Sequence, residues 1–292
     1  MTSVETSLPI LEQTTRYYTD FPETSYVLPS DEKERKRLVF QHYLMKRGFD
    51  QRNVHAPIIL KSSDKVLETG TGSGVWLLDL ATEIPNDVEM QGTDIESKIF
   101  PVPETYPNNI QFSVHSVTSL PRAWTDRFTL VHQRLLVASL QDAQWHKAIN
   151  EIYRVIAPGG WVQLFEASEW PAGPVSTKHR ALLTALGRQR GITWDCHKYI
   201  PRMLVDAGFV DLKVVPMETP LGKWGGEYGV AHRKNLIEVW RGMKAPILKA
   251  GGFGFVNSEQ EFDQLMADLE TEWDDTPGSA FTYITWCAQK PL

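Results

Sequence analysis

The residues with the clearest chemical potential form a glycine-rich segment near position 70. Glu68–Gly74 reads Glu-Thr-Gly-Thr-Gly-Ser-Gly, follows a short apolar run and precedes Val75-Trp76-Leu77-Leu78. Glycine is required where a backbone passes close to a ligand or adopts a positive φ, and backbone amides at the start of a helix can bind an anionic group. We therefore predict a ligand-binding turn between a strand and a helix, with the preceding acid facing a cationic group of the ligand. The residues assigned to this turn are Glu68, Gly70, Thr71, Gly72 and Gly74.

A second acid follows the turn at the spacing of a ribose-binding carboxylate. Val88–Asp94 ends in that acid, about 20 residues after the glycines. A dinucleotide fingerprint requires glycine at position 75, where Val75 stands. The pattern therefore favours a nucleoside without pyrophosphate, with Asp94 at the ribose hydroxyls. The alternative is that the glycines form an ordinary turn and that Asp94 only caps the next helix.

The elements that must position these residues are short strands alternating with helices. From Lys65 onward, short apolar runs alternate with helical patterns, which is typical of βα units and a mostly parallel sheet. The sequence thus predicts an α/β protein. The predicted strands cover residues 65–69, 88–93, 110–114, 128–132, 160–166, 209–216 and 280–288.

Two helices have recognisable ends in the sequence. Ser30 is predicted to cap the first, which carries an apolar stripe made of Leu38, Val39, Tyr43 and Leu44. Asp142 is predicted to cap the second, which Pro158-Gly159-Gly160 would end.

We divide the chain into three parts. Residues 1–55 form an N-terminal arm and a lid helix, 56–169 form the nucleoside-binding core, and 170–292 complete the sheet. The last part contains two insertions, at about 170–205 and 222–275, that are predicted to cap the site.

Composition narrows the class of protein. The 292 residues carry a formal net charge of −6, which disfavours nucleic acid as a partner, because phosphate binding needs concentrated Lys and Arg. Cys196 and Cys287 are far apart and lack the spacing of a zinc site or a disulfide framework. Neither a signal peptide nor a membrane-spanning run is evident. These features predict a cytoplasmic protein without a membrane partner.

Several segments resemble a known family, the fungal class I methyltransferases of the LaeA-like secondary-metabolism group. The resemblance extends over most of the chain from Tyr26 onward. The segments that carry it are Tyr26–Glu32, Arg37-Leu38, Gln41-His42, Val66–Trp76, Phe128–Arg134, Glu151–Trp161 and Ala288–Pro291.

The resemblance implies a Rossmann-like, seven-stranded class I methyltransferase sheet with helical cap insertions. It also implies S-adenosyl-L-methionine as the cofactor and methyl transfer to a small secondary metabolite. Many relatives place Asp where His115-Ser116-Val117 stands here, so Ser116 or a backbone amide is expected to contact the adenine amino group. The further cofactor contacts expected are Tyr26, Ile95, Ser116, Val117 and His132.

Catalysis by such a protein consists mainly of holding the acceptor in line with an already activated methyl group. A general base, where one is needed, contributes ~10²–10⁴-fold. The candidates are His132, Glu166 and His197; for each, a purely structural role is the competing interpretation. Arg134 either orients an acidic substrate or caps a helix.

Aromatic residues of the predicted cap suggest a planar or hydrophobic acceptor. They are Trp170, Trp194, Trp224, Tyr228, Phe253, Phe255 and Trp273. Two other functions remain open at this point: a LaeA-like regulatory or partner-binding protein, and a cyclase that binds the cofactor without transferring its methyl group.

Overall fold

The computed structural model describes residues 16–19, 21, 24–171 and 173–292. Most of the predicted arm, including residues 1–15, therefore lies outside the described residues. No helix in the described ranges has the length and apolar character needed to cross a bilayer.

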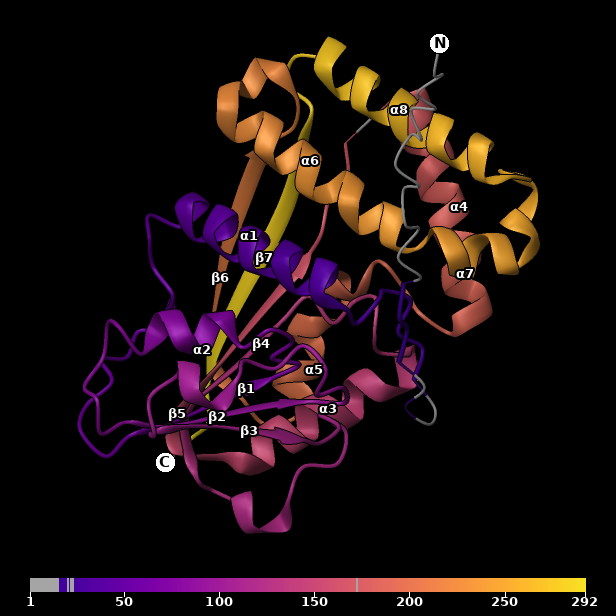
Figure 1. Cartoon of the computed structure of the whole chain (residues 1–292). Coiled ribbons are helices and arrows are strands. Elements are labelled where there is room, and N and C mark those ends of the chain that lie inside the picture. Colours follow the sequence, from indigo (N-terminus) through magenta and orange to yellow (C-terminus); the bar gives the residue numbers. More distant parts are fainter. Residues whose placement is uncertain (1–15, 20, 22–23, 172) are drawn as a thin grey trace, which may run out of the picture.

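A single seven-stranded sheet organises the described chain (Figure 1). Its order is β3-β2-β1-β4-β5-β7-β6, with β1 to β5 parallel and β7 antiparallel to both of its neighbours. This confirms the predicted α/β sheet. The strands are β1 (Lys65–Thr69), β2 (Glu89–Asp94), β3 (Ile110–Val114), β4 (Phe128–Arg134), β5 (Ile156–Ala167), β6 (Val210–Pro220) and β7 (Ala280–Gln289).

The strand order reverses at β1, which pairs with β2 on one side and with β4 on the other. In open parallel sheets, connections on either side of such a point leave opposite faces, which opens a crevice at the carboxyl ends of the strands. The glycine turn leaves β1 at this crevice. Asp94 ends β2 beside it.

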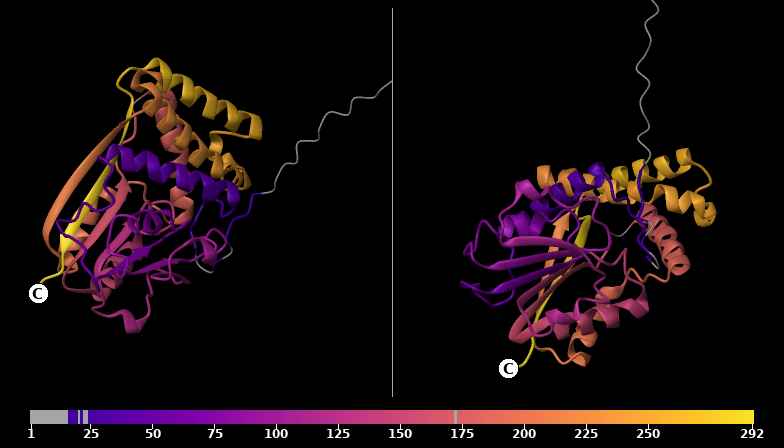
Figure 2. Two further views of the ribbon diagram at one scale, coloured as in Figure 1. Left: turned by 60° about the vertical axis from the view of Figure 1, so that its left-hand side comes forward. Right: turned by 60° about the horizontal axis from the view of Figure 1, so that its bottom comes forward.

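Helices cover both faces and one end of the sheet. Figures 1 and 2 show α6, α7 and α8 as a helical layer at one end, while α3 and α5 lie against the sheet on the side away from α1. Helix α1 lies between α6 and α2 and contacts both. The helices are α1 (Glu32–Gly48), α2 (Val75–Leu80), α3 (Asp142–Val155), α4 (Pro174–Arg190), α5 (Ile200–Asp206), α6 (Gly226–Gly242), α7 (Lys244–Lys249) and α8 (Glu259–Asp275).

Helices α6, α7 and α8 all lie between β6 and β7, in the segment where an insertion is predicted at about 222–275. In the insertion predicted at about 170–205, α4 contacts α8, whereas α5 contacts α3. The second half of that range therefore packs against the sheet layer and not with the end helices.

Alternate residues of the central strands fill two separate cores. Leu67 and Val131 point toward the side of α3, where they pack with Ile149. Their neighbours Val66 and Leu130 point the other way and pack against α2. The two-residue period of a strand thus fixes which side chains can reach the crevice from each face.

The predicted start of α1 is wrong, and of its predicted stripe only Leu44 is buried. Asp31, not Ser30, is the N-cap, and its Oδ1 accepts a hydrogen bond from the Glu34 N–H at 3.0 Å. Tyr43, assigned to the stripe, is 54% exposed. The buried face is largely polar because it covers the crevice and a charged network, so an apolar pattern could not reveal it. Its buried residues are Glu34, Gln41, His42, Leu44 and Met45.

The predicted ends of α3 also need correction. Gln141 is the N-cap and forms a capping box with Gln144, so Asp142 is the first helical residue. The helix ends at Val155, before Pro158. Strand β5 begins at once, and a register shift against β4 accommodates the proline and glycines.

Candidate active site

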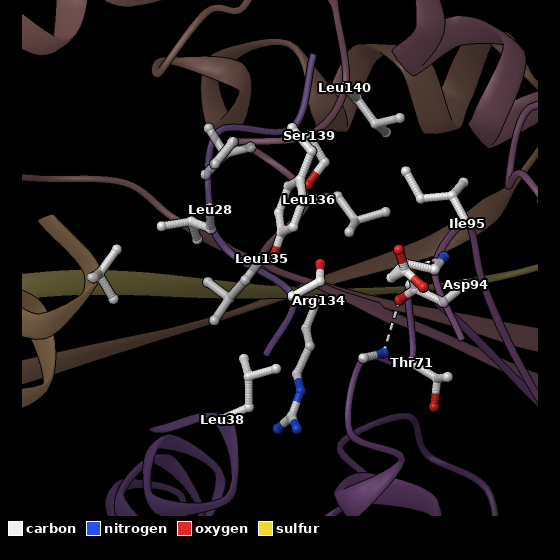
Figure 3. Close-up of a pocket in the computed structure, with 18 of the residues that line it drawn as sticks. Leu28, Leu38, Thr71, Asp94, Ile95, Arg134, Leu135, Leu136, Ser139 and Leu140 are labelled. Atoms are coloured by element: carbon white, nitrogen blue, oxygen red, sulfur yellow. Dashed lines mark hydrogen bonds between the residues drawn. The ribbon is translucent and has the colours of Figure 1, made fainter. Parts of the chain in front are cut away.

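A cavity of about 320 Å³ opens at the carboxyl ends of β1, β2 and β4. One end is formed by the glycine turn and the residues that follow β2 and β3, where Figure 3 shows Thr71, Asp94 and Ile95. The other end is formed by α6, β7 and aromatic side chains. The segment around Tyr26 and helix α1 form further walls. The cavity therefore joins a polar end at the strand crevice to an apolar end at the helical layer.

The glycines of the turn serve two purposes. Gly70 and Gly72 line the cavity with φ of 65° and 54°, in the left-handed region that favours glycine. A Cβ on Gly72 would lie 3.2 Å from Leu38 Cδ1, so α1 closes tightly over the turn. Gly74 lies behind the turn, where a Cβ would lie 2.6 Å from the ring of Phe112. It is the N-cap of α2 and packs against the sheet without lining the cavity.

Asp94 connects the turn to the end of β2. Its Oδ2 accepts the Gly72 N–H at 2.8 Å and its Oδ1 accepts the Glu96 N–H at 3.2 Å. Burial raises the pKa of this carboxyl, while the backbone donors oppose that rise. Asp94 and Ile95 both line the cavity, next to the glycines.

Glu68 is a buried acid with one oxygen free. Its Oε2 accepts a hydrogen bond from Thr71 Oγ1 at 2.5 Å, and its Oε1 has no partner among the described residues. Burial raises the pKa of Glu68 to about 7, against the opposing effect of the Arg134 charge. The side chain does not itself line the cavity, but it contacts Thr71, which does. An unpaired carboxylate oxygen in this place suits a cationic group.

Ser116 and Val117 follow β3 and line the same polar end. The Ser116 Oγ lies 2.8 Å from Thr118 Oγ1 and accepts the Thr118 N–H at 3.3 Å. Its hydroxyl is thus held by its own turn. Val117 and Ile95 supply apolar surface to this end.

His132 does not reach this cavity. Its ring stacks on Trp76 with centroids 4.0 Å apart, and its Nδ1 lies 3.3 Å from Gln163 Nε2. It borders a separate cavity of about 30 Å³, and burial holds its pKa well below the ordinary value. Trp76, on α2, is itself buried, so the histidine is part of the packed layer under that helix.

Glu166 and His197 also lie outside the cavity wall. The Glu166 carboxylate accepts the backbone N–H of Leu136 at 2.7 Å and of Val137 at 3.2 Å, and burial raises its pKa to about 8. It therefore holds the loop that follows β4. His197 lies in a short turn beside Asp195, and burial lowers its pKa. The structure does not bring the three predicted bases together.

Two residues of the cavity wall were missed or left open by the sequence. Arg37 lines the cavity and forms a bidentate pair with Glu34, with Nη2 2.6 Å from Oε1. Arg134, which ends β4, lines the cavity with a guanidinium that points between Leu38 and Thr71 (Figure 3). Arg134 lies two residues after His132 and therefore on the same face of the strand, which is the sequence feature that could have indicated its place in the site.

The apolar end is built from aromatic residues of distant segments. Trp170 stacks on Trp240 with ring centroids 5.0 Å apart and an interplanar angle of 18°. Trp194 and Tyr283 line the same end. Of the predicted cap aromatics, Trp170 and Trp194 lie here, whereas Trp224 is 41% exposed. Trp240 was missed, although Leu236, Val239, Trp240 and Met243 recur at helical spacing.

Comparison with known proteins agrees with this geometry. Residues 66–160 match the family described as a methyltransferase domain. The N-methyltransferase sirN of Leptosphaeria maculans is 29% identical over 93% of this chain and 97% of its own length. The methyltransferase grgD of a Penicillium species is 30% identical over 86% of this chain and 94% of its own length.

A solved structure shows the same fold. The phosphoethanolamine N-methyltransferase 2 of Haemonchus contortus, in complex with S-adenosyl-L-methionine, superposes with a TM-score of 0.51 at 16% identity. The match covers 92% of this chain and 54% of that one. Taken with the glycine turn, Asp94 and the full-length relatives, it leads to one conclusion: the chain belongs to the fungal class I S-adenosylmethionine-dependent methyltransferases.

Proposed function

We propose that this protein transfers the methyl group of S-adenosylmethionine to a nitrogen atom of a small, largely apolar acceptor. The observation that carries the proposal is the continuous cavity, which joins the turn at Gly72 and Asp94 to the stacked rings of Trp170 and Trp240. Nitrogen is chosen as the methylated atom because sirN, which matches nearly the whole chain, is an N-methyltransferase.

The residues at the polar end fit the cofactor. Asp94 would accept hydrogen bonds from the ribose hydroxyls, and the unpaired Oε1 of Glu68 would face the α-ammonium group. Ile95 and Val117 would pack on the adenine faces, with Ser116 at the edge of the ring. The glycine turn leaves space for close approach of the nucleoside. The bound cofactor supplies a methyl group on a positively charged sulfur, which is already activated for transfer.

Tyr26 and Tyr283 extend the wall between the two ends of the cavity. Their burial raises the pKa of both phenols, so the phenols stay neutral and act as polar walls without charge. We propose that these residues and the Trp170–Trp240 pair hold a planar acceptor with its nitrogen toward the polar end. Enclosure also keeps water away from the reacting atoms.

The acceptor nitrogen must lose a proton at some stage if it starts as N–H. We propose that His132, Glu166 and His197 do not take that proton, because none lines the cavity. Rate enhancement would then come chiefly from alignment, which requires a nitrogen whose lone pair is free at neutral pH.

The test is a methyl-transfer assay on matched acceptors. One aromatic skeleton is supplied with an amine, an amide, a hydroxyl or a thiol, and both the methylated product and S-adenosylhomocysteine are measured. The expected result is methylation of a nitrogen compound with equimolar S-adenosylhomocysteine, which is lost in Asp94→Ala. Methylation of only the hydroxyl or thiol compound would overturn the choice of nitrogen.

The same assay separates the other functions. Acceptor conversion without S-adenosylhomocysteine would indicate a cyclase. Transfer of labelled methyl to a protein, with none to small molecules, would indicate a regulatory methyltransferase.

A further inference from the structure

The guanidinium of Arg134 is a partly buried cation without a carboxylate partner among the described residues. It forms one hydrogen bond, from Nη1 to His42 Nδ1 at 3.0 Å, and within the described ranges its Nε and Nη2 have no partner. No ion pair to this side chain occurs among the described residues. Burial lowers its pKa, while the charges of Glu68 and Asp79 oppose that change. An unpaired guanidinium in a cavity wall is costly unless a ligand supplies the anion.

We propose that Arg134 binds the α-carboxylate of the methionine part of S-adenosylmethionine through its two free N–H groups. This inference rests on the proposed function. The planar fork of a guanidinium matches a carboxylate in bidentate geometry, so the free Nε and Nη2 form a ready subsite.

The position of Glu68 favours a zwitterionic ligand at this place. Glu68 is in register with His132 on the neighbouring parallel strand, so its side chain leaves the same sheet face as that of Arg134. The Arg134 charge acts on the Glu68 carboxyl, yet these two described side chains form no ion pair. Glu68 Oε1 and the Nε and Nη2 of Arg134 thus remain free to bind a ligand. An amino acid group placed between them satisfies both, with its ammonium on Glu68 and its carboxylate on Arg134.

The amides at the start of α2, which the sequence suggested as the carboxylate site, are a poorer candidate. That helix has only six residues, and its N-cap Gly74 packs behind the turn against Phe112. A guanidinium in the cavity wall offers a full charge instead.

His42 and Asp79 act as positioning residues for Arg134. An arginine can only donate, so His42 Nδ1 accepts, and its Nε2–H donates to Asp79 Oδ2 at 3.0 Å. Asp79 also accepts from Lys46 Nζ and from Asn53 Nδ2, at 2.5 and 2.7 Å. Burial and the Arg134 charge lower the His42 pKa to about 4, so the ring stays neutral at physiological pH. Helix α1 thereby fixes the guanidinium through its Nη1 and leaves Nε and Nη2 for the proposed ligand.

A competing occupant of the free N–H groups is water. Arg134 also borders the cavity of about 30 Å³ that His132 and Gln163 line. A space of about 30 Å³ has room for one or two waters and is too small for an amino acid group. A guanidinium directed into that space would contribute nothing to recognition of the carboxylate.

The experiment compares two ligands by isothermal titration calorimetry. S-adenosylhomocysteine carries the amino acid group, and 5′-methylthioadenosine has the same thioether nucleoside without it. For Arg134→Gln we expect the affinity for S-adenosylhomocysteine to fall roughly ten- to a hundredfold, the range for a lost charge-assisted pair. The affinity for 5′-methylthioadenosine should stay within about twofold. Retained binding of this ligand also shows that the variant is folded.

Two further variants sharpen the result. Arg134→Lys keeps the charge but loses the fork, so an intermediate loss is expected. Arg35→Gln is the matched control: this arginine of α1 lies outside the cavity wall and is paired with Glu32, so the ratio of the two affinities should not change. Equal weakening of both ligands in Arg134→Gln, or no weakening, overturns the inference. If the wild-type protein binds neither ligand, the proposed function itself fails.

Discussion

The backbone N–H of Gly72 donates to Asp94 Oδ2 at 2.8 Å and so ties the glycine turn after β1 to the end of β2. The carboxylate holds the turn and also faces the cavity. We expect Asp94→Ala to weaken both S-adenosylhomocysteine and 5′-methylthioadenosine by roughly tenfold or more, because both contain the ribose that a charged acceptor would bind. Asp94→Asn keeps an oxygen that can accept the Gly72 N–H, so this variant should lose less affinity for both ligands. Titration calorimetry on both ligands tests this, and unchanged affinities in Asp94→Ala would remove the ribose assignment.

Gly72→Ala should affect both stability and binding. A left-handed φ costs an L-residue ~1–2 kcal/mol, and the new Cβ would press on Leu38 Cδ1 at 3.2 Å. Gly251→Ala is the matched control, since its φ is 77° but nothing lies within 4 Å of its Cβ position. Urea unfolding should show a similar loss in both variants. Only Gly72→Ala should lose affinity for S-adenosylhomocysteine. A loss of affinity in both variants would mean that destabilisation alone explains it.

The affinity for S-adenosylhomocysteine should depend on pH through Glu68. Its pKa in the free protein is raised to about 7, and an ammonium bound beside it favours the ionised carboxylate. Binding must therefore weaken as pH falls below about 7, by up to roughly tenfold per pH unit, as Glu68 takes up a proton. Glu68→Gln should abolish this slope. Titrations with 5′-methylthioadenosine, which lacks the ammonium, should show no slope in either protein; an equal slope for both ligands would contradict the assignment.

Glu166 should make folding stability fall as pH rises. Burial raises its pKa from 4.5 to about 8, so between these values the folded state holds a proton that the unfolded state has released. The unfolded chain then binds fewer protons, and the free energy of unfolding decreases with pH by at most ~1.4 kcal/mol per unit in that window. Glu166→Gln cannot ionise but still offers an oxygen to the Leu136 amide.

The measured quantity is the difference in unfolding free energy between wild type and Glu166→Gln. It should decline from pH 5 to pH 8, whereas contributions from the buried histidines cancel in the difference. A constant difference would show that the two backbone donors keep the carboxylate ionised.

Local patterns were enough to predict the strands and to place the glycine turn and Asp94 at one edge of the sheet. The glycine turn and Asp94 are separated by one βα unit, so spacing along the chain determines their proximity. The role of His132 could not be judged in this way. His132 and Arg134 share a strand face, yet the first stacks on Trp76 and only the second lines the cavity.

The apolar end was harder to predict because long-range packing assembles it. Trp170 precedes α4 and Trp240 lies in the last turn of α6, so nothing in their local sequence indicates that their rings stack. The polar face of α1 is a similar case. His42 is buried because Arg134 and Asp79, from two other elements, supply its hydrogen bonds.

Trp240 should govern acceptor binding without affecting the cofactor. Trp240→Ala removes one ring of the stacked pair, and aromatic stacking contributes ~0.5–1.5 kcal/mol beyond the area that it buries. We expect the KM for the acceptor to rise by roughly tenfold, from lost stacking and lost apolar contact together. Trp240→Phe keeps an aromatic ring at this position, so its KM for the acceptor should rise much less. Trp224 is an exposed tryptophan outside the cavity, so Trp224→Phe should leave the KM for the acceptor unchanged. Because the polar end lies at the opposite side of the cavity, affinity for S-adenosylhomocysteine should stay within about twofold in all three variants; a parallel loss would mean that the tryptophan supports the whole fold of the site and not the acceptor alone.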